Sequence, residues 1–476
     1  MSKAKGMSRA GRGGGKRAKA NVRREADAPG ARPGPRPAGT PRAKVWAYRQ
    51  GLGDCFLLAF PREKPSADGR THVFILIDCG VVLGTPDAAA KMRDVVRDIR
   101  QKIGPANHLD VLVVTHEHWD HLSGFLQAED EFDGLAVGQV WLGWTENPED
   151  PQAAALAASR AKALNALRLA AAGVRLAGGG EAADDIENIL GFFGAAKGGT
   201  TGDAMAVVRR LGGSNVVYRE PGEPPVALPD VPGVRVFVLG PPRDERFLKR
   251  TDPRHDDHEG YGLALDVFLE ATGNQEASWS PFDPMRQIPM PVAREIGFFK
   301  SRYWEAGKAD EGWRRIDNAW AGDPTEFALR LDNLTNNTSL VLAFEFPDGD
   351  VLLFVADAQV GNWLSWQSIN WTTDSGSVSG PDLLRRAIFY KVGHHGSHNA
   401  TLKEGGLEIM GRLQLAYIPV NHDMAVKKRW TRMPLPEIVE RLEQLIPGSV
   451  MRADQASPTA IPDRVVTTDL YFEMTF

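Results

Sequence analysis

The sequence predicts an α/β fold whose strands are covered on both faces by other layers. Short apolar runs rich in β-branched residues alternate with longer segments in which apolar residues recur every three or four positions. Runs that are apolar on both sides are typical of strands buried on both faces, and the longer spacing is typical of amphipathic helices. Apolar residues make up 42% of the 476-residue chain, which is enough to build a packed core.

Eight segments are expected to form strands. In chain order they are 45–48, 73–77, 111–114, 234–239, 340–346, 351–355, 388–392 and 415–420. Helices are expected over 87–103, 151–171 and 435–446. A single domain over residues 44–476 can hold all these elements if the Ala-rich, helical range 143–220 and the range 243–330 are insertions. Insertions of this size usually shape the rim of a site, where substrates are selected.

Charge is unevenly distributed along the chain. Residues 1–44 carry 13 Lys and Arg against two acidic residues, a net charge of +11, whereas the rest carries 43 against 59, or −16. Because this N-terminal stretch is also rich in Gly and Pro, residues 1–43 are interpreted as a disordered tail. No apolar run is long enough for a secretory signal or a membrane span, which predicts a cytoplasmic protein that does not enter a membrane.

The cysteine count limits the chemistry that the chain can use. Cys55 and Cys79 are the only cysteines, and both lie in or beside apolar runs. Two cysteines cannot build a disulfide framework, so buried free thiols are expected. A structural zinc site made of cysteines is excluded by the count alone.

The segment THEHWDH at residues 115–121, directly after an expected strand, contains four side chains that could bind metal ions. Alternate residues of an extended loop face the same way, so His116 and His118 can bind one cation together. Asp120 and His121, at the turn into a helix expected to begin near Leu122, are placed to bind a second cation. Imidazole and carboxylate are ligands that zinc, manganese and iron accept. A histidine-rich surface loop without metal is the alternative, and four potential ligands within six residues argue against it.

Two later residues follow strands in the same manner. Asp357 comes after VLLFVA and could bridge two cations, and His394 comes after IFYKVG. Taken alone, Asp357 could equally be a cap or turn carboxylate and His394 a hydrogen-bonded loop imidazole. Together with the first motif, both are predicted to be metal ligands.

At this point the chain resembles the metallo-β-lactamase superfamily, and more closely its ComEC/Rec2-type branch of DNA-uptake proteins. The motifs that carry the resemblance are GLGDCFLL at 51–58, ILIDCG at 75–80, THEHWDHLSG at 115–124, VLGPP at 238–242, NNTSLVL at 336–342, VLLFVADA at 351–358 and KVGHHGS at 391–397. The likeness extends over about residues 44 to 460. The first histidine motif is specific for the superfamily, and HHGS supports the branch.

The resemblance implies a four-layer αββα sandwich with two divalent metal ions at one edge, zinc first and manganese as the alternative. It assigns His116 and His118 to the first metal and Asp120 and His121 to the second. Asp357 would bridge the two metals, and His394 would complete the second site.

A third histidine for the first metal is missing from the motif. The residues standing in its place are Asn336, Asn337 and Thr338. The first site is therefore expected to be weaker, or to recruit a histidine from elsewhere. The candidates are His395 and His398, with His255, His258 and His422 as less favoured alternatives.

The implied mechanism is hydrolysis by a metal-bound hydroxide. Divalent cations lower the pKa of a bound water toward about 7 and polarise the bond under attack. Asp120 and Asp357 would orient this nucleophile. The residues that could stabilise developing charge or protonate the leaving group are His395, Ser397 and His398. Asp54 and Asp78 are expected to brace the ligand histidines.

The substrate is less closely defined than the chemistry. The resemblance favours a phosphodiesterase or nuclease acting on DNA, and the basic tail and eight tryptophans from Trp279 onward could hold nucleic acid. Most of these tryptophans are nevertheless expected in the core, and the acidic body argues against a long basic groove. The alternatives are a hydrolase of small esters, lactones or amides, and a metal-stabilised binding component of a bacterial defence system. Protein partners are not predicted.

Overall fold

The computed structural model describes residues 41–176, 180–194, 199–251, 288, 290–304, 324–374, 376–456 and 463–476. The expected basic tail up to residue 40, the histidines at 255 and 258, and most of the expected insertion 243–330 lie outside the described residues. Residues Pro37–Phe476 make up one compact unit.

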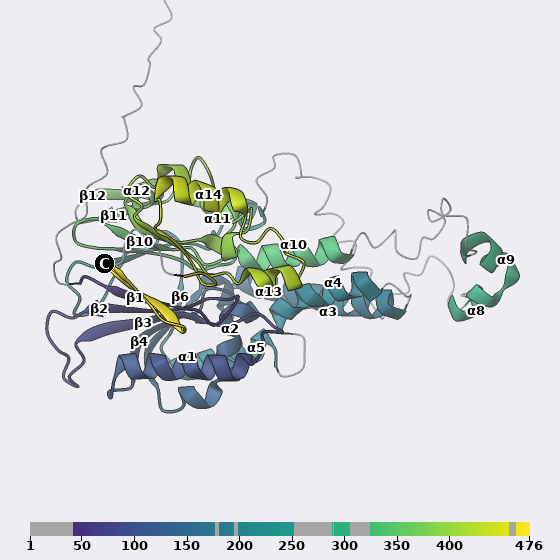
Figure 1. Ribbon diagram of the computed structural model, residues 1–476, viewed down its shortest axis with the longest axis horizontal. Coiled ribbons are helices and arrows are strands. Elements are labelled where there is room, and N and C mark those ends of the chain that lie inside the picture. Colours follow the sequence, from purple (N-terminus) through teal and green to yellow (C-terminus); the bar gives the residue numbers. More distant parts are fainter. Residues whose placement is uncertain are drawn as a thin grey trace, which may run out of the picture. The chain divides into compact units, whose positions relative to one another are not determined.

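Two large sheets form the centre of this unit (Figure 1). The first has eight strands in the order β16-β17-β1-β2-β3-β4-β5-β6. Its strands are β1 (Lys44–Tyr48), β2 (Cys55–Pro61), β3 (His72–Cys79), β4 (His108–Val113), β5 (Ala136–Gly143), β6 (Val216–Arg219), β16 (Val465–Thr467) and β17 (Tyr471–Thr475). Strands β3 to β6 run parallel, and the strands from β16 to β3 are antiparallel.

The second sheet has seven strands in the order β15-β14-β13-β10-β9-β8-β7. Its strands are β7 (Val226–Ala227), β8 (Arg235–Gly240), β9 (Val341–Glu345), β10 (Val351–Phe354), β13 (Ala387–Lys391), β14 (Leu415–Ile418) and β15 (Val450–Arg452). A separate hairpin joins β11 (Asn370–Thr373) to β12 (Gly376–Ser379). All eight strands expected from the sequence are confirmed, within one to three residues at their ends.

Aromatic residues fill the space between the two sheets. The Phe56 ring of β2 lies 5.6 Å from the rings of both Phe354 and Tyr417, which belong to the second sheet. The Phe60 and Phe344 rings are stacked at 5.6 Å. Such pairs contribute about 0.5–1.5 kcal/mol each beyond the free energy of burying their area. This packing fixes the two sheets against each other.

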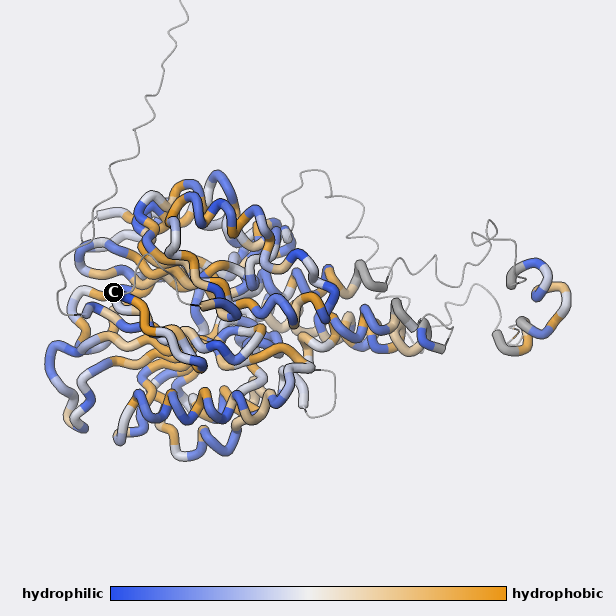
Figure 2. Tube along the Cα trace, viewed as in Figure 1, coloured by the Kyte–Doolittle hydropathy of each residue, from blue (hydrophilic) through white to orange (hydrophobic). Residues whose placement is uncertain are grey.

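Helices cover both outer faces of the sandwich. The first sheet is covered by α1 (Ala88–Ile103), α2 (Trp119–Gln127) and α5 (Thr201–Gly212). The second is covered by α11 (Val360–Trp366), α12 (Gly380–Arg385) and α14 (Pro436–Leu445). Beside the sandwich, a group of helices that pack on one another is formed by α3 (Pro151–Leu176), α4 (Gly180–Leu190) and α10 (Pro324–Asn336) (Figure 1). In Figure 2 the strands are mostly hydrophobic, and α1 alternates between hydrophilic and hydrophobic along its length. The expected four-layer αββα arrangement is confirmed.

The expected helices are confirmed as α1, α3 and α14. The range 143–220 is helical over α3, α4 and α5, but its last residues form the edge strand β6. Further α-helices in the described part of the chain are α6 (Glu245–Leu248), α8 (Met290–Glu295), α9 (Gly297–Phe299) and α13 (His422–Lys427). Within the described residues, none of the helices is both long enough and apolar enough to traverse a bilayer.

Both cysteines are buried free thiols, as expected. They face each other across the β2–β3 pair, where Cys55 is the register partner of Cys79. They therefore contribute to the core of the first sheet.

Gly80 lets the start of α2 approach the end of β3 very closely. A Cβ atom on Gly80 would lie 2.4 Å from the backbone carbon of Asp120 and 2.5 Å from the backbone nitrogen of His121. The Asp54 backbone N–H donates to the Asp120 carbonyl in the same place (3.0 Å). The backbone that carries two predicted metal ligands is thus held directly against β3.

We expect Gly80→Ala to lower the free energy of unfolding by about 1–3 kcal/mol, because backbone atoms cannot move aside as a flexible side chain can. Urea denaturation monitored by circular dichroism measures this change. Gly411→Ala is the matched control, since a Cβ there meets no atom within 4 Å. Equal effects of the two substitutions would contradict the close packing at Gly80.

Candidate metal centre

The His-Asp loop (residues 115–121) leaves the end of β4 and runs into the first turn of α2, which begins three residues earlier than expected, at Trp119. His116, His118, Asp120 and His121 are all buried, each with at most 1% of its surface exposed. The His116 Nε2 atom lies 3.1 Å from His118 Nδ1, and the rings of His116 and His121 are 4.2 Å apart. The loop therefore gathers its four predicted ligands in one place.

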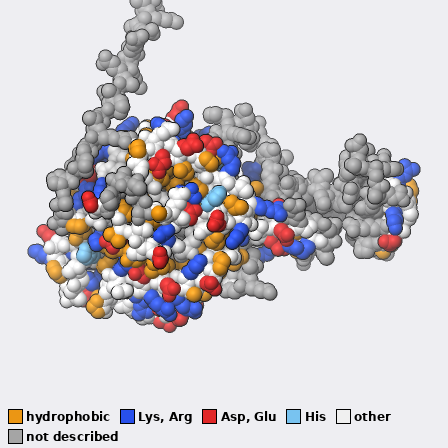
Figure 3. All heavy atoms as spheres, in the orientation of Figure 1, with side chains coloured by type: hydrophobic (Ala, Val, Ile, Leu, Met, Phe, Trp, Pro, Cys, Tyr) orange, Lys and Arg blue, Asp and Glu red, His pale blue; other side chains and the backbone are white. Residues whose placement is uncertain are grey.

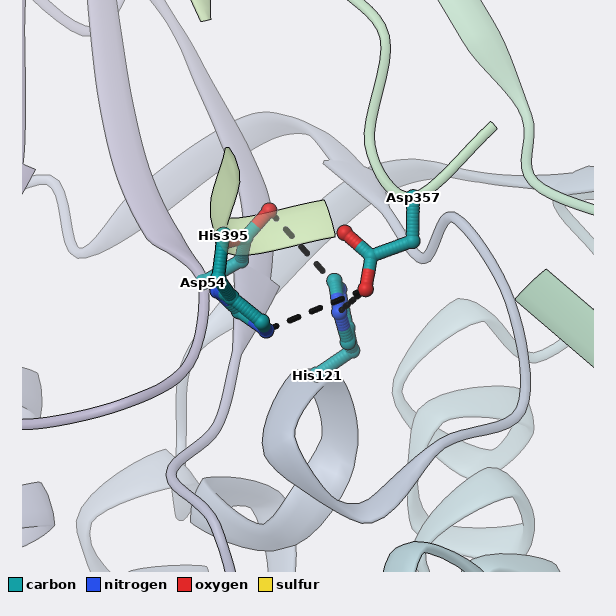
Figure 4. Close-up of side chains that lie close together, drawn as sticks. All are labelled: Asp54, His121, Asp357 and His395. Carbon is teal, nitrogen blue, oxygen red and sulfur yellow. Dashed lines mark ion pairs between the residues drawn. The ribbon is translucent and has the colours of Figure 1, made fainter. Parts of the chain in front are cut away.

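Residues from the second sheet complete the cluster. Asp357 follows β10, and His394 and His395 follow β13. Asp357 Oδ2 lies 3.2 Å from His121 Nε2, 3.8 Å from His395 Nε2 and 4.0 Å from His394 Nε2. Figure 4 shows the side chains of His121, Asp357 and His395 pointing toward one another. The structure thus brings together all six predicted metal ligands.

His395 approaches Asp120 more closely than the sequence motif indicated. Its Nε2 lies 2.9 Å from Asp120 Oδ2, while its Nδ1 lies 2.7 Å from the Pro419 carbonyl oxygen. An imidazole whose Nδ1 is held by a carbonyl keeps Nε2 for a metal ion. His394 Nε2 lies instead 3.4 Å from Asn336 Nδ2. By this geometry His395 fits the second metal position better than His394.

The backbone is in the left-handed region at four non-glycine residues around the cluster. The φ angles are 56° at Asp78, 49° at Ala356, 41° at His394 and 52° at His395. Non-glycine residues in this region are uncommon and tend to gather at functional sites, where the surrounding structure holds them. Here they aim the side chains that follow β3, β10 and β13 into one volume.

Asp78 braces His121, as the sequence predicted. Its Oδ2 lies 2.8 Å from His121 Nδ1, and it accepts hydrogen bonds from the backbone N–H (2.8 Å) and the hydroxyl (2.7 Å) of Thr115. A carboxylate on Nδ1 fixes the ring and leaves Nε2 available to a cation. Asp78 thereby orients His121 toward Asp357.

A buried lysine explains the position of Asp54. Potential ligand atoms of Asp54, His121, Asp357 and His395 all lie within 4.8 Å of one another. Asp54, however, faces both imidazoles from their Nδ1 side, at 3.9 Å in each case. Its Oδ2 contacts Lys391 Nζ at 2.5 Å, and the same ammonium lies 3.3 Å from Asp357 Oδ1. Asp54 therefore lies on the Nδ1 side of the two imidazoles and is linked to Asp357 through Lys391.

Asn336 stands where the third histidine of the first metal is missing. Its Oδ1 lies 3.2 Å from His116 Nε2, and its Nδ2 donates to Asp332 Oδ2 (3.1 Å). Asp332 in turn lies 3.7 Å from His118 Nε2. The amide oxygen of Asn336 is thus directed toward the position where His116 and His118 would hold a cation.

The charges and the unpaired atoms of the cluster fit divalent cations. The buried carboxylates at this edge are those of Asp54, Asp78, Asp120, Asp332 and Asp357. Within the described residues, Lys391 is the only buried ammonium or guanidinium group that contacts any of them. Asp120 Oδ1 and His121 Nε2 are buried without a hydrogen-bond partner there. Because buried charge needs compensation, this donor set matches metal ions well.

The pKa values of the imidazoles divide into two groups. Burial lowers the pKa of His118 to about 3 and that of His394 to about 4, so both rings are neutral and can donate a lone pair. The pKa of His121 is raised well above its usual value although burial opposes this, because the carboxylates of Asp357, Asp120 and Asp78 favour a positive charge. The surrounding carboxylates therefore favour positive charge at His121.

Three further predicted residues lie away from the cluster. Ser397 and His398 line a neighbouring pocket, and the Ser397 hydroxyl donates to Asn399 Oδ1 (3.1 Å). His422 begins α13, where its Nδ1 lies 2.9 Å from the Met433 carbonyl oxygen. The pocket positions of Ser397 and His398 suit contact with a substrate better than coordination of a metal, and His422 belongs to neither the cluster nor this pocket.

Comparison with known families agrees with this geometry. Residues 71–172 match the model of the metallo-beta-lactamase superfamily. The matched range runs from β3 through the His-Asp loop into α3, so it contains four of the predicted ligands and ends before Asp357 and His394. The match supports the metallo-β-lactamase fold and indicates a metal-dependent hydrolase. No curated protein and no solved structure matches the chain.

We expect the purified protein to bind two divalent cations per chain, because one group of donor atoms gathers at His116 and His118 and another at His121, His395 and Asp357. Elemental analysis after dialysis measures the content. His121→Ala should remove at least one cation, whereas His108→Ala, at the other end of β4, should remove none. Equal metal content in the two variants would contradict the assignment.

Asp78→Ala should weaken metal affinity about 10- to 100-fold, which is the usual effect of removing the partner of a ligand histidine. Isothermal titration with zinc measures the affinity. Thermal unfolding of the metal-free variant separates a loss of orientation from a loss of fold. An unchanged affinity would show that Asp78 does not orient His121.

Proposed function

We propose that this protein is a metal-dependent phosphodiesterase that cleaves DNA. The convergence of His121 Nε2, His395 Nε2, Asp120 and Asp357 within one buried cluster carries the hydrolase part of the proposal. The side chains proposed to hold one cation are those of His116 and His118 together with the Asn336 amide oxygen. The side chains proposed to hold the other are those of Asp120, His121, His395 and Asp357.

Two divalent cations, zinc or manganese, would supply an activated water and polarise the phosphoryl group. In the hydrolysis, a water oxygen forms a bond to phosphorus, the bond from phosphorus to the leaving oxygen breaks, and the leaving oxygen takes up a proton. Asp120 and Asp357 are proposed to orient the water. Ser397 and His398, on the wall of the adjoining pocket, are the proposed donors to the leaving oxygen.

A local basic segment supports a phosphodiester substrate. Lys427, Lys428, Arg429 and Arg432 lie in one run of six residues (the basic segment, 427–432) that also contains Trp430. Trp430 lines the same pocket as His394. On the face shown in Figure 3, Lys and Arg side chains lie among Asp and Glu side chains, and no broad basic surface is seen on that face. We therefore place the phosphate contacts at the basic segment beside this pocket.

The hydrophobic wall of the pocket favours a second candidate, hydrolysis of a small ester, lactone or amide. The pocket has a volume of about 330 Å³ and includes Ile189, Phe192 and Leu435. This volume lies at the lower end of the range of ligand pockets, about 300–1,000 Å³. A small apolar substrate would not need the basic segment.

We expect metal-loaded protein to cleave DNA and bis(p-nitrophenyl) phosphate faster than p-nitrophenyl esters. The double variant His116→Ala, Asp120→Ala should lose about 1,000-fold or more in kcat/KM for both phosphodiesters, because it removes a ligand from each cation. His108→Ala is the control.

The other outcomes are distinct. Faster turnover of esters would favour the small-molecule hydrolase. Metal bound without turnover of any substrate would favour a binding component and would refute the phosphodiesterase.

A further inference from the structure

The pocket beside the metal centre has one polar wall and one aromatic wall. The polar wall includes Asp332 and His394. Asp332 Oδ1 lies 3.7 Å from His118 Nε2, and His394 Nε2 lies 4.0 Å from Asp357 Oδ2. A group that enters this pocket therefore comes close to the proposed metal ligands.

Phe192 and Trp430 form the aromatic wall. Their rings are stacked, with centroids 5.1 Å apart and planes inclined by 20°. Phe192 also packs against the ring of His118, at a centroid distance of 5.5 Å. Phe192 is buried, whereas Trp430 is only half-buried, so part of the Trp430 indole is accessible to a ligand. The aromatic wall thus extends from the metal centre to the protein surface.

The basic segment carries four cations next to Trp430 in the sequence, and its Arg432 lines the same pocket as Trp430. Lys427 is exposed and has no ion-pair partner within the described residues. The Arg429 side chain pairs with Asp185 and is 52% exposed, and the Arg432 side chain pairs with Glu437 and is 67% exposed. Because the body of the chain is acidic, this run of four cations next to a pocket residue is a local exception that suits an anionic ligand.

Aromatic faces beside cations are the usual means of binding single-stranded nucleic acid, since bases stack on the rings and phosphates contact the cations. The pocket volume of about 330 Å³ suits one nucleotide and not a base-paired duplex. A base inside a duplex is stacked and paired, so it cannot enter without being extruded.

We propose that the basic segment, together with Phe192 and Trp430, forms a subsite that binds one unpaired nucleotide of single-stranded nucleic acid next to the metal centre. The base would stack on Trp430, and Lys427 and Arg432 would contact the flanking phosphates. This proposal rests on the proposed phosphodiesterase function and adds its preference for single strands.

The test is binding of a fluorescently labelled DNA strand of about 12 nucleotides to the full chain in the presence of a chelator, which prevents cleavage. Fluorescence anisotropy should show at least 10-fold tighter binding of the single strand than of the matching duplex. Trp430→Ala should weaken single-strand binding about 10-fold, and Trp430→Phe should retain most of it. Residues 1–44 are present in every variant, so their contribution cancels in the comparison.

Removing charge tests the phosphate contacts. The double variant Lys427→Ala, Arg432→Ala should reduce the dependence of log K on log salt by about 0.7 for each phosphate that it no longer neutralises. Lys91→Ala, Arg97→Ala is a matched control on α1, because Lys91 is exposed and Arg97 is an exposed arginine paired with Glu131. The control should change neither the affinity nor the salt dependence.

Wild-type binding by Trp430→Ala, or equal affinity for duplex and single strand, would overturn the subsite. A loss of ester hydrolysis in Trp430→Ala without a loss of DNA binding would assign the pocket to a small molecule and would also overturn it. Failure of metal-loaded wild-type protein to cleave bis(p-nitrophenyl) phosphate would refute the proposed function independently, since this substrate carries no nucleotide. If the protein has both the phosphodiesterase activity and the subsite, Trp430→Ala should lower kcat/KM for single-stranded DNA at least 10-fold more than it lowers kcat/KM for bis(p-nitrophenyl) phosphate.

Discussion

The negative charge of the buried aspartates at one edge of the sandwich is the constraint on which the site depends. Carboxylates removed from water are stable only beside compensating charge or hydrogen-bond donors. Lys391 neutralises Asp54 and approaches Asp357, while Asp120 faces mainly imidazoles. The arrangement therefore favours cations, and metal binding should stabilise the folded chain, because the unfolded chain does not hold these groups together.

Each of the two sheets supplies some of the residues of the metal centre. The first sheet supplies the His-Asp loop and its brace Asp78, and the second supplies Asp357 and His395. Distances between these groups consequently depend on how the sheets pack, and contacts such as Phe56 with Phe354 hold that packing. Ligands carried on rigid strand ends keep their geometry better than ligands on long loops.

The residues proposed to contact the substrate lie in other parts of the chain than the proposed metal ligands. Phe192 follows α4, in a segment outside the two sheets, and Trp430 follows α13. Phe192 packs on the ring of His118, and Trp430 packs on Phe192. Such segments can change without disturbing the metal ligands, which is how one scaffold can serve many reactions.

The sequence by itself determined the parts that depend on local pattern. Apolar runs predicted eight strands, three- and four-residue spacing predicted α1, α3 and α14, and the THEHWDH segment predicted the cluster after β4. The short strand β6 was not predicted, because its four residues are only half-buried and because its pairing partner, β5, lies far earlier in the chain. The stacked pair of Phe192 and Trp430 gave no local signal either, although the run of four cations around Trp430 was visible in the sequence.

Only the tertiary structure decided how the donor atoms face one another. Left-handed backbone at both His394 and His395 turns His395 toward Asp120, and the HHGS motif does not reveal that geometry. Lys391 is the polar member of an apolar strand, and its role follows only from Asp54 and Asp357 beside it. Asn336 meets His116 across 220 positions of the chain. Local pattern reports local preference, whereas contacts between distant segments arise only when the sheets pack and bury their charges together.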